Sequence, residues 1–98
     1  MLHIINKSPL TNVSLDSCLG VVQSGDILLI EDAVVAATAG NACAAKLKEA
    51  MGRCKVYVLQ PDLEARGLAD RLLEGVSPVD YGGFVDLAES NKTCQSWL

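Results

Sequence analysis

The four cysteines are the residues of this chain that could do chemistry, and Cys18 is the most informative of them. It lies in the sequence Ser-Leu-Asp-Ser-Cys-Leu, residues 14–19, where a first helix is expected to begin. No two cysteines have the Cys-x-x-Cys spacing of a zinc ribbon or a thioredoxin-type motif. A lone thiol in a small domain leaves three uses: it fills the core, it senses redox state, or it carries sulfur.

The surroundings of Cys18 support two interpretations. Leu15, Cys18, Leu19 and Val22 recur at the i, i+3, i+4, i+7 spacing of one helix face, which favours a buried thiol in the core. Helical side chains lean toward the helix N-terminus, so the thiol could instead face the loop of residues 8–12. A helix dipole would favour a thiolate at such a place. The residues alone leave both interpretations open.

The other three cysteines are expected to be structural. Cys43 lies in an alanine-rich helical stretch and is typical of a small buried hydrophobic residue. Cys54 stands between Arg53 and Lys55, whose positive charges would lower the pKa of its thiol, but it also begins a predicted strand. Cys94 belongs to an extended tail.

Length and charge restrict the class of protein. The 98 residues form one domain spanning 1–98, and the net charge is −4 with scattered lysines and arginines. We therefore expect neither direct binding of nucleic acid nor a polybasic contact of the chain with a membrane, because both need a basic patch. We expect no signal peptide, and no apolar run reaches the roughly 20 residues that a membrane span needs. We expect a cytoplasmic protein whose thiols stay reduced.

Neither a cofactor nor a metal is predicted. The first loop, residues 7–12, has no glycine with which to cradle a phosphate. Acidic residues end the strands and would repel an anion: Glu31, Asp32, Asp62 and Asp80. His3 is the sole histidine and stands within a predicted strand, so a converging set of metal ligands is not indicated.

Strand-like and helix-like stretches alternate along the chain. We expect strands at residues 2–6, 27–30, 55–59, 77–80 and 93–98, and helices at 15–22, 33–39, 42–51, 63–66 and 84–90, with another turn within 68–73. Residues 60–62 and 81–83 are expected to be turns, with Asp32 capping the helix that follows it. Pro78 suits an edge strand.

This order predicts an α/β protein. A strand–helix repeat gives a parallel sheet with helices on both faces. The chain is therefore expected to form a small flavodoxin-like three-layer fold of about five mainly parallel strands. Ligands of such sheets bind outside the carboxyl ends of the strands, where the four acidic residues would lie.

Seven short stretches, in order, resemble the TusB/DsrH family of sulfur-relay proteins over the whole chain. They are MLHIINKSP (1–9), SGDILLIED (24–32), VVAA (34–37), KVYVL (55–59), PDLEARG (61–67), DYGGFVDL (80–87) and QSWL (95–98). The resemblance implies the DsrEFH-like version of the fold. Each stretch is weak alone, but the ordered set is specific.

The resemblance also implies partners. Such a chain is one subunit of a heterohexamer, two copies each of three related chains, with TusC/DsrF-like and TusD/DsrE-like partners and a downstream TusE/DsrC-like sulfur acceptor. The complex passes persulfide sulfur toward 2-thiolation of the wobble uridine of tRNA (TusBCD-like) or serves cytoplasmic dissimilatory sulfur oxidation (DsrEFH-like). The principal sulfur-accepting cysteine belongs to the TusD/DsrE-like chain, so this chain is not expected to be an enzyme on its own.

Cys18 is the one cysteine with a matching context in the family. The Dsr branch carries a cysteine in a Ser-Leu-x-Ser-Cys-Leu stretch, which residues 14–19 match, whereas the Tus branch has an aliphatic residue there. The chain therefore looks closer to the DsrH branch, and Cys18 is the candidate persulfide carrier. The alternative is a non-catalytic scaffold subunit that only completes the complex, with Cys18 buried.

Overall fold

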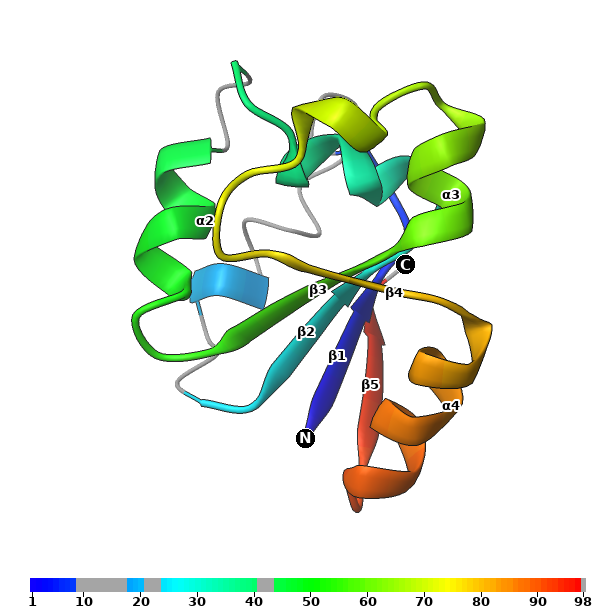
Figure 1. Cartoon of the computed structure of the whole chain (residues 1–98). Helices are drawn as coiled ribbons and strands as arrows, with labels where there is room; N and C mark the ends of the chain where they lie inside the picture. Colours follow the sequence, from blue (N-terminus) through cyan, green and yellow to red (C-terminus); the bar gives the residue numbers. More distant parts are fainter. Residues whose placement is uncertain (9–17, 21–23, 41–43, 98) are drawn as a thin grey trace.

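The computed structural model describes residues 1–8, 18–20, 24–40 and 44–97. Its five strands are β1 (Leu2–Ile5), β2 (Asp26–Leu29), β3 (Lys55–Leu59), β4 (Ser77–Val79) and β5 (Cys94–Trp97). Its helices are η1 (Glu31–Ala37), α2 (Ala44–Ala50), α3 (Gln60–Ala65), η2 (Ala69–Arg71) and α4 (Tyr81–Ser90), and residues 18–20 are also helical (Figure 1). η1 and η2 are 3₁₀ helices.

All five strands lie in one parallel sheet of order β4-β3-β2-β1-β5. This confirms the predicted flavodoxin-like α/β fold, including the edge position of the strand that contains Pro78. The chain steps in one direction from β1 to β4 and then crosses back to the far side of β1. Because parallel connections are right-handed, the return connection lies on the opposite face from the first three.

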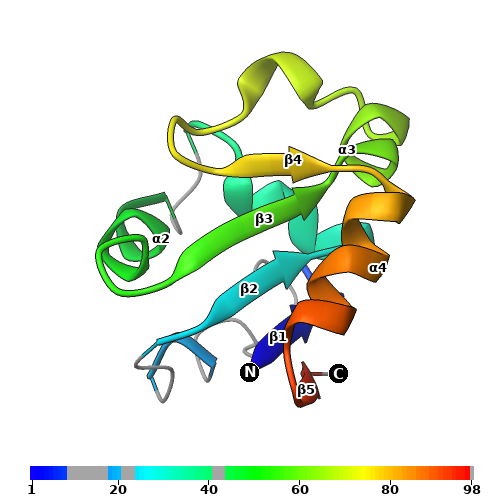
Figure 2. The same ribbon diagram turned by 60° about the horizontal axis from the view of Figure 1, so that its bottom comes forward.

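The two faces of the sheet are therefore covered unequally. On the face that we call the helix-rich face, Ile5, Ile27, Leu29, Val56 and Val58 form one buried core with residues from the first three connections. Their alternating neighbours point to the other face, which α4 covers and which we call the α4 face. Figure 2 shows α4 on the near side of the sheet and η1 beyond it.

Two helices begin earlier than the sequence predicted. Residues 60–62 form the first turn of α3, because Pro61 lies at a first-turn position where its missing N–H costs no hydrogen bond. Residues 81–83 form the first turn of α4, because the Asp80 carboxylate accepts a hydrogen bond from the Gly83 N–H at 2.7 Å and caps the helix. Both stretches were expected to be turns, and that expectation was wrong.

The predicted capping role of Asp32 was also wrong. Ile30 stands at the N-cap of η1 without a side-chain cap. Asp32 instead accepts from Arg66, the C-cap residue of α3, whose Nη2 lies 2.9 Å from Asp32 Oδ1. The helix predicted at residues 33–39 is a 3₁₀ helix, and of the helix predicted at 15–22 only residues 18–20 are among the described residues.

Gly25 gives a test of how tightly the sheet's amino edge is built. Its φ is +110°, and a Cβ there would lie 2.6 Å from the Met1 carbonyl oxygen. We predict that Gly25→Ala lowers the free energy of unfolding by more than about 2 kcal/mol, because strained backbone and a steric clash add together. Urea denaturation measures this loss.

Gly40→Ala is the matched control. Gly40 has a φ of +88° but no heavy atom within 4 Å of the added Cβ, so only the backbone cost of about 1–2 kcal/mol remains. Equal losses in the two variants would show that the contact with Met1 is not as close as described.

Candidate functional site

Cys18 lies in the interior of the helix-rich face. Its exposed fraction is 0%, and it belongs to the same core cluster as Ile5 and Leu47. Burial is the main cause that raises the pKa of Cys18 to about 11, and repulsion by the negative charge of a Cys54 thiolate is the second. In this conformation the thiol is protonated near neutral pH and has no path to a donor in solvent.

Cys54 is the neighbour of Cys18 in this core. It directly precedes β3, and its exposed fraction is 6%. Burial raises the pKa of Cys54, and the positive charge of Arg53 offsets only part of that effect. Arg53 thus lowers this pKa as the sequence indicated, but desolvation outweighs its effect and the net shift is upward.

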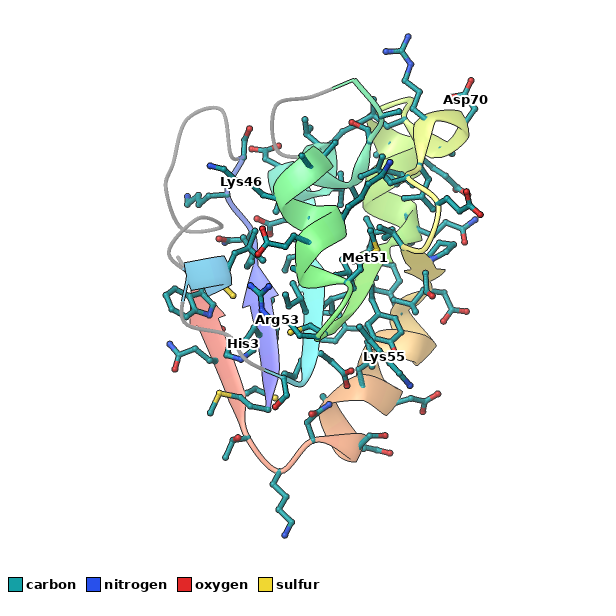
Figure 3. All side chains as sticks on the ribbon, turned by 90° about the vertical axis from the view of Figure 1, so that its left-hand side faces the viewer. His3, Lys46, Met51, Arg53, Lys55 and Asp70 are labelled. Carbon is teal, nitrogen blue, oxygen red and sulfur yellow. The ribbon has the colours of Figure 1, made fainter. Side chains whose placement is uncertain are left out.

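Arg53 ties the start of β3 to the helical turn that carries Cys18. Its Nη2 donates to the Leu19 carbonyl oxygen at 2.8 Å, across 34 positions of sequence. Its Nη1 lies 3.7 Å from a carboxylate oxygen of Glu49 on α2. Figure 3 looks onto this side of the molecule, with Arg53 beside residues 18–20. The spacing of the residues in the sequence gave no signal of this contact.

The remaining cysteines stand in different surroundings. Cys94 is exposed on the edge strand β5, opposite Leu2 of β1. Cys43 lies outside the part of the chain that the structure describes. Of the described cysteines, Cys94 is thus the one that solvent reaches freely.

His3 acts as a hydrogen-bond acceptor in the sheet. Its Nδ1 accepts from the Trp97 indole N–H at 3.2 Å, and its ring is buried. Burial and the nearby N-terminal amino group lower the pKa of His3, which favours the neutral ring that this bond requires. The bond holds the end of β5 against β1.

The acidic residues at the carboxyl edge hold elements together. The Glu31 N–H donates to Asp62 Oδ2 at 2.7 Å, and Glu31 has a φ of 50°, a value that residues other than glycine rarely adopt. Arg66 bonds both Asp32 and the Asp62 carbonyl oxygen. Within the described ranges, no group of three or more His, Cys, Asp or Glu side chains could hold a metal ion.

A surface hollow lies at the opposite, amino edge of the strands. It measures about 420 Å³ and is open to solvent, and its walls are Gly25, Asp26, Met51, Gly52, Arg53, Cys54 and Lys55. Ligands of parallel sheets bind at the carboxyl edge, so this hollow is not where the fold would place a substrate.

None of the helices that the structure describes is long and apolar enough to cross a membrane.

The chain is similar to known proteins over nearly its full length. Residues 7–94 match the family model described as DsrH like protein. The TusB protein of Shigella flexneri is 38% identical over 99 residues, which cover 99% of this chain and 100% of that protein. The TusB protein of Serratia proteamaculans is 37% identical, with the same coverage.

The chain belongs to the TusB/DsrH family. This confirms the resemblance that the ordered stretches indicated. Solved structures show the same fold: the ychN protein from E. coli superposes with a TM-score of 0.80 at 18% identity, covering 97% of each chain. MTH1491 from Methanobacterium thermoautotrophicum superposes with a TM-score of 0.68 at 19% identity, covering 97% of this chain and 95% of that one.

The burial of Cys18 predicts a clear order of thiol reactivity. With a pKa of about 11, roughly one Cys18 thiol in a thousand is ionised at pH 8. We predict that iodoacetamide at pH 8 alkylates the exposed Cys94 at least about tenfold faster than Cys18 in the folded protein. Peptide mass spectrometry measures both rates.

Protein unfolded in urea is the control, because there the two thiols should react at similar rates. Labelling of Cys18 as fast as Cys94 in the folded chain would contradict the described burial.

Proposed function

We propose that this chain is a subunit of a sulfur-relay complex that handles persulfide sulfur. The observation that carries the proposal is its full-length similarity to TusB proteins. The net charge of −4 supports a relay between proteins and disfavours a chain that grips tRNA itself. The complex would work in the cytoplasm, with TusC/DsrF-like and TusD/DsrE-like chains as partners in a heterohexamer.

The relay has two possible ends: 2-thiolation of the tRNA wobble uridine, or cytoplasmic sulfur oxidation. The cysteine at position 18 favours the second, as in the DsrH branch, whereas the TusB names of the relatives favour the first. In both, a TusE/DsrC-like protein would take sulfur from the complex.

A sulfur-carrying role for Cys18 has a definite chemical requirement. The Cys18 thiolate would attack the outer sulfur of a donor persulfide, R–S–SH, forming Cys18–S–SH and releasing R–S⁻. The thiolate must therefore meet the donor. The thiol must be both ionised and accessible to the donor. With 0% exposure and a pKa of about 11, Cys18 is neither unless residues 18–20 leave the core.

The geometry accordingly favours the scaffold role over the carrier role. Cys18 packs in the core that supports β1 to β3, and the principal sulfur acceptor would lie on a partner chain. The chain would then contribute surface and shape to the complex, while Cys18 contributes packing.

Replacement of Cys18 by valine separates the two roles. Cys18→Val keeps the core apolar and removes the sulfur, so the scaffold role predicts a relay rate within about twofold of wild type. The assay combines the chain with its two partner chains and a persulfide donor, and follows sulfur on the downstream acceptor.

Cys94→Ala is the matched control, since it removes an exposed thiol without touching the core. Mass spectrometry of the assembled wild-type complex gives the second readout. A gain of one sulfur on Cys18, together with a loss of more than about tenfold in rate for Cys18→Val, would establish Cys18 as a carrier instead.

A further inference from the structure

The α4 face of the sheet is thinly covered. In the described part of the chain, α4 is the helix on this face, and it has ten residues, none of them buried. Phe84, Leu87 and Ala88 are half-buried, as are Ile4 and Tyr57 on the strands of the same face. Leu2 and Leu28 on the same face have no exposed surface, so the apolar area that stays open here is the outer side of α4 together with parts of Ile4 and Tyr57.

The outer side of α4 carries exposed apolar side chains. Tyr81 is 62% exposed and Val85 is 55% exposed, and their i, i+4 spacing places them one turn apart on the helix. Tyrosine is among the residues that most often carry binding energy in interfaces. The described residues hold one other large hydrophobic side chain this exposed, Met1 at the start of β1.

The apolar pair lies in an acidic stretch of the sequence. The stretch from Leu72 to Asn91 holds four acidic residues and no lysine or arginine; the acidic residues are Glu74, Asp80, Asp86 and Glu89. A symmetric dimer through α4 would set this stretch against its own copy and bring like charges together. The charge therefore favours a different chain with basic residues around an apolar recess.

The size of the helix sets the extent of the contact. Ten helical residues are about 15 Å long and about 10 Å wide, which gives a footprint of about 150 Å². This area is far less than the roughly 800 Å² that each partner of a stable interface buries. A partner seated on α4 must also reach the strands beside it. On the α4 face, Ile4 and Tyr57 are half-buried and stand on either side of Leu28, which is fully buried.

We propose that α4 is a docking surface for a basic partner chain, in which Tyr81 and Val85 enter an apolar recess while Asp86 and Glu89 meet lysines or arginines at its rim. This inference rests on the proposed function, which supplies the candidate partners: the two other chains of the relay complex. It adds which face of this chain they cover and which chemistry they present.

Two pairs of variants test the proposal. Val85→Glu places a charge at the centre of the surface, and Ala45→Glu makes a similar change at an exposed position of α2, beyond the opposite face of the sheet. Asp86→Lys reverses a rim charge, and Asp70→Lys does the same in η2, at the outer end of the molecule (Figure 3). All four positions are exposed, so the fold should tolerate each change.

Affinity for the two partner chains, alone and together, is measured by calorimetry at two salt concentrations. We expect Val85→Glu to weaken binding by about tenfold or more and Asp86→Lys by about threefold or more. The affinity of Asp86→Lys should also change less with salt concentration than the affinity of wild type. Ala45→Glu and Asp70→Lys should bind within about twofold of wild type.

The outcomes separate the two proposals. If wild type binds the partner chains and Val85→Glu and Asp86→Lys bind equally well, the α4 surface is wrong while the relay function stands. If wild type binds neither chain, the proposed function fails and the docking surface falls with it. A wild-type chain that forms dimers alone, and that Val85→Glu makes monomeric, would show that the occupant is a second copy.

Discussion

The right-handedness of parallel connections is the constraint on which this structure depends. Three successive connections step from β1 to β4 in one direction, so they lie on one face of the sheet. The return to β5 runs the other way, and it places α4 alone among the described helices on the second face. A helix-rich face formed by three connections and an α4 face covered by one helix follow from the strand order, before any particular side chain is considered.

This asymmetry decides what Cys18 can do. Its helical turn belongs to the first connection, so the thiol lies in the core of the helix-rich face with Cys54 and Leu47. Burial raises its pKa, and Arg53 fixes the turn by bonding to Leu19. A thiol in such a place contributes to the core. The same topology leaves Tyr81 and Val85 exposed on the α4 face.

The sequence predicted those features that depend on local pattern. The strand at residues 55–59 was predicted from its apolar run, and the one predicted at 77–80 was assigned to an edge because of Pro78; in the structure it ends at Val79. The first turns of α3 and α4 were missed, because Pro61 and the two glycines after Tyr81 disfavour helices in general and are tolerated in a first turn. The contact between Arg53 and Leu19 had no local signal, since it joins residues that only the fold brings together.

Hydrogen–deuterium exchange of the chain, free and in complex with its two partner chains, tests the central claim most directly. The claim is that the chain serves as a subunit whose α4 face binds a partner chain. It predicts that amides of α4, residues 81–90, exchange at least about tenfold more slowly in the complex, while those of α2, residues 44–50, do not change. Protection of α2 and of residues 18–20 with α4 unchanged would contradict it.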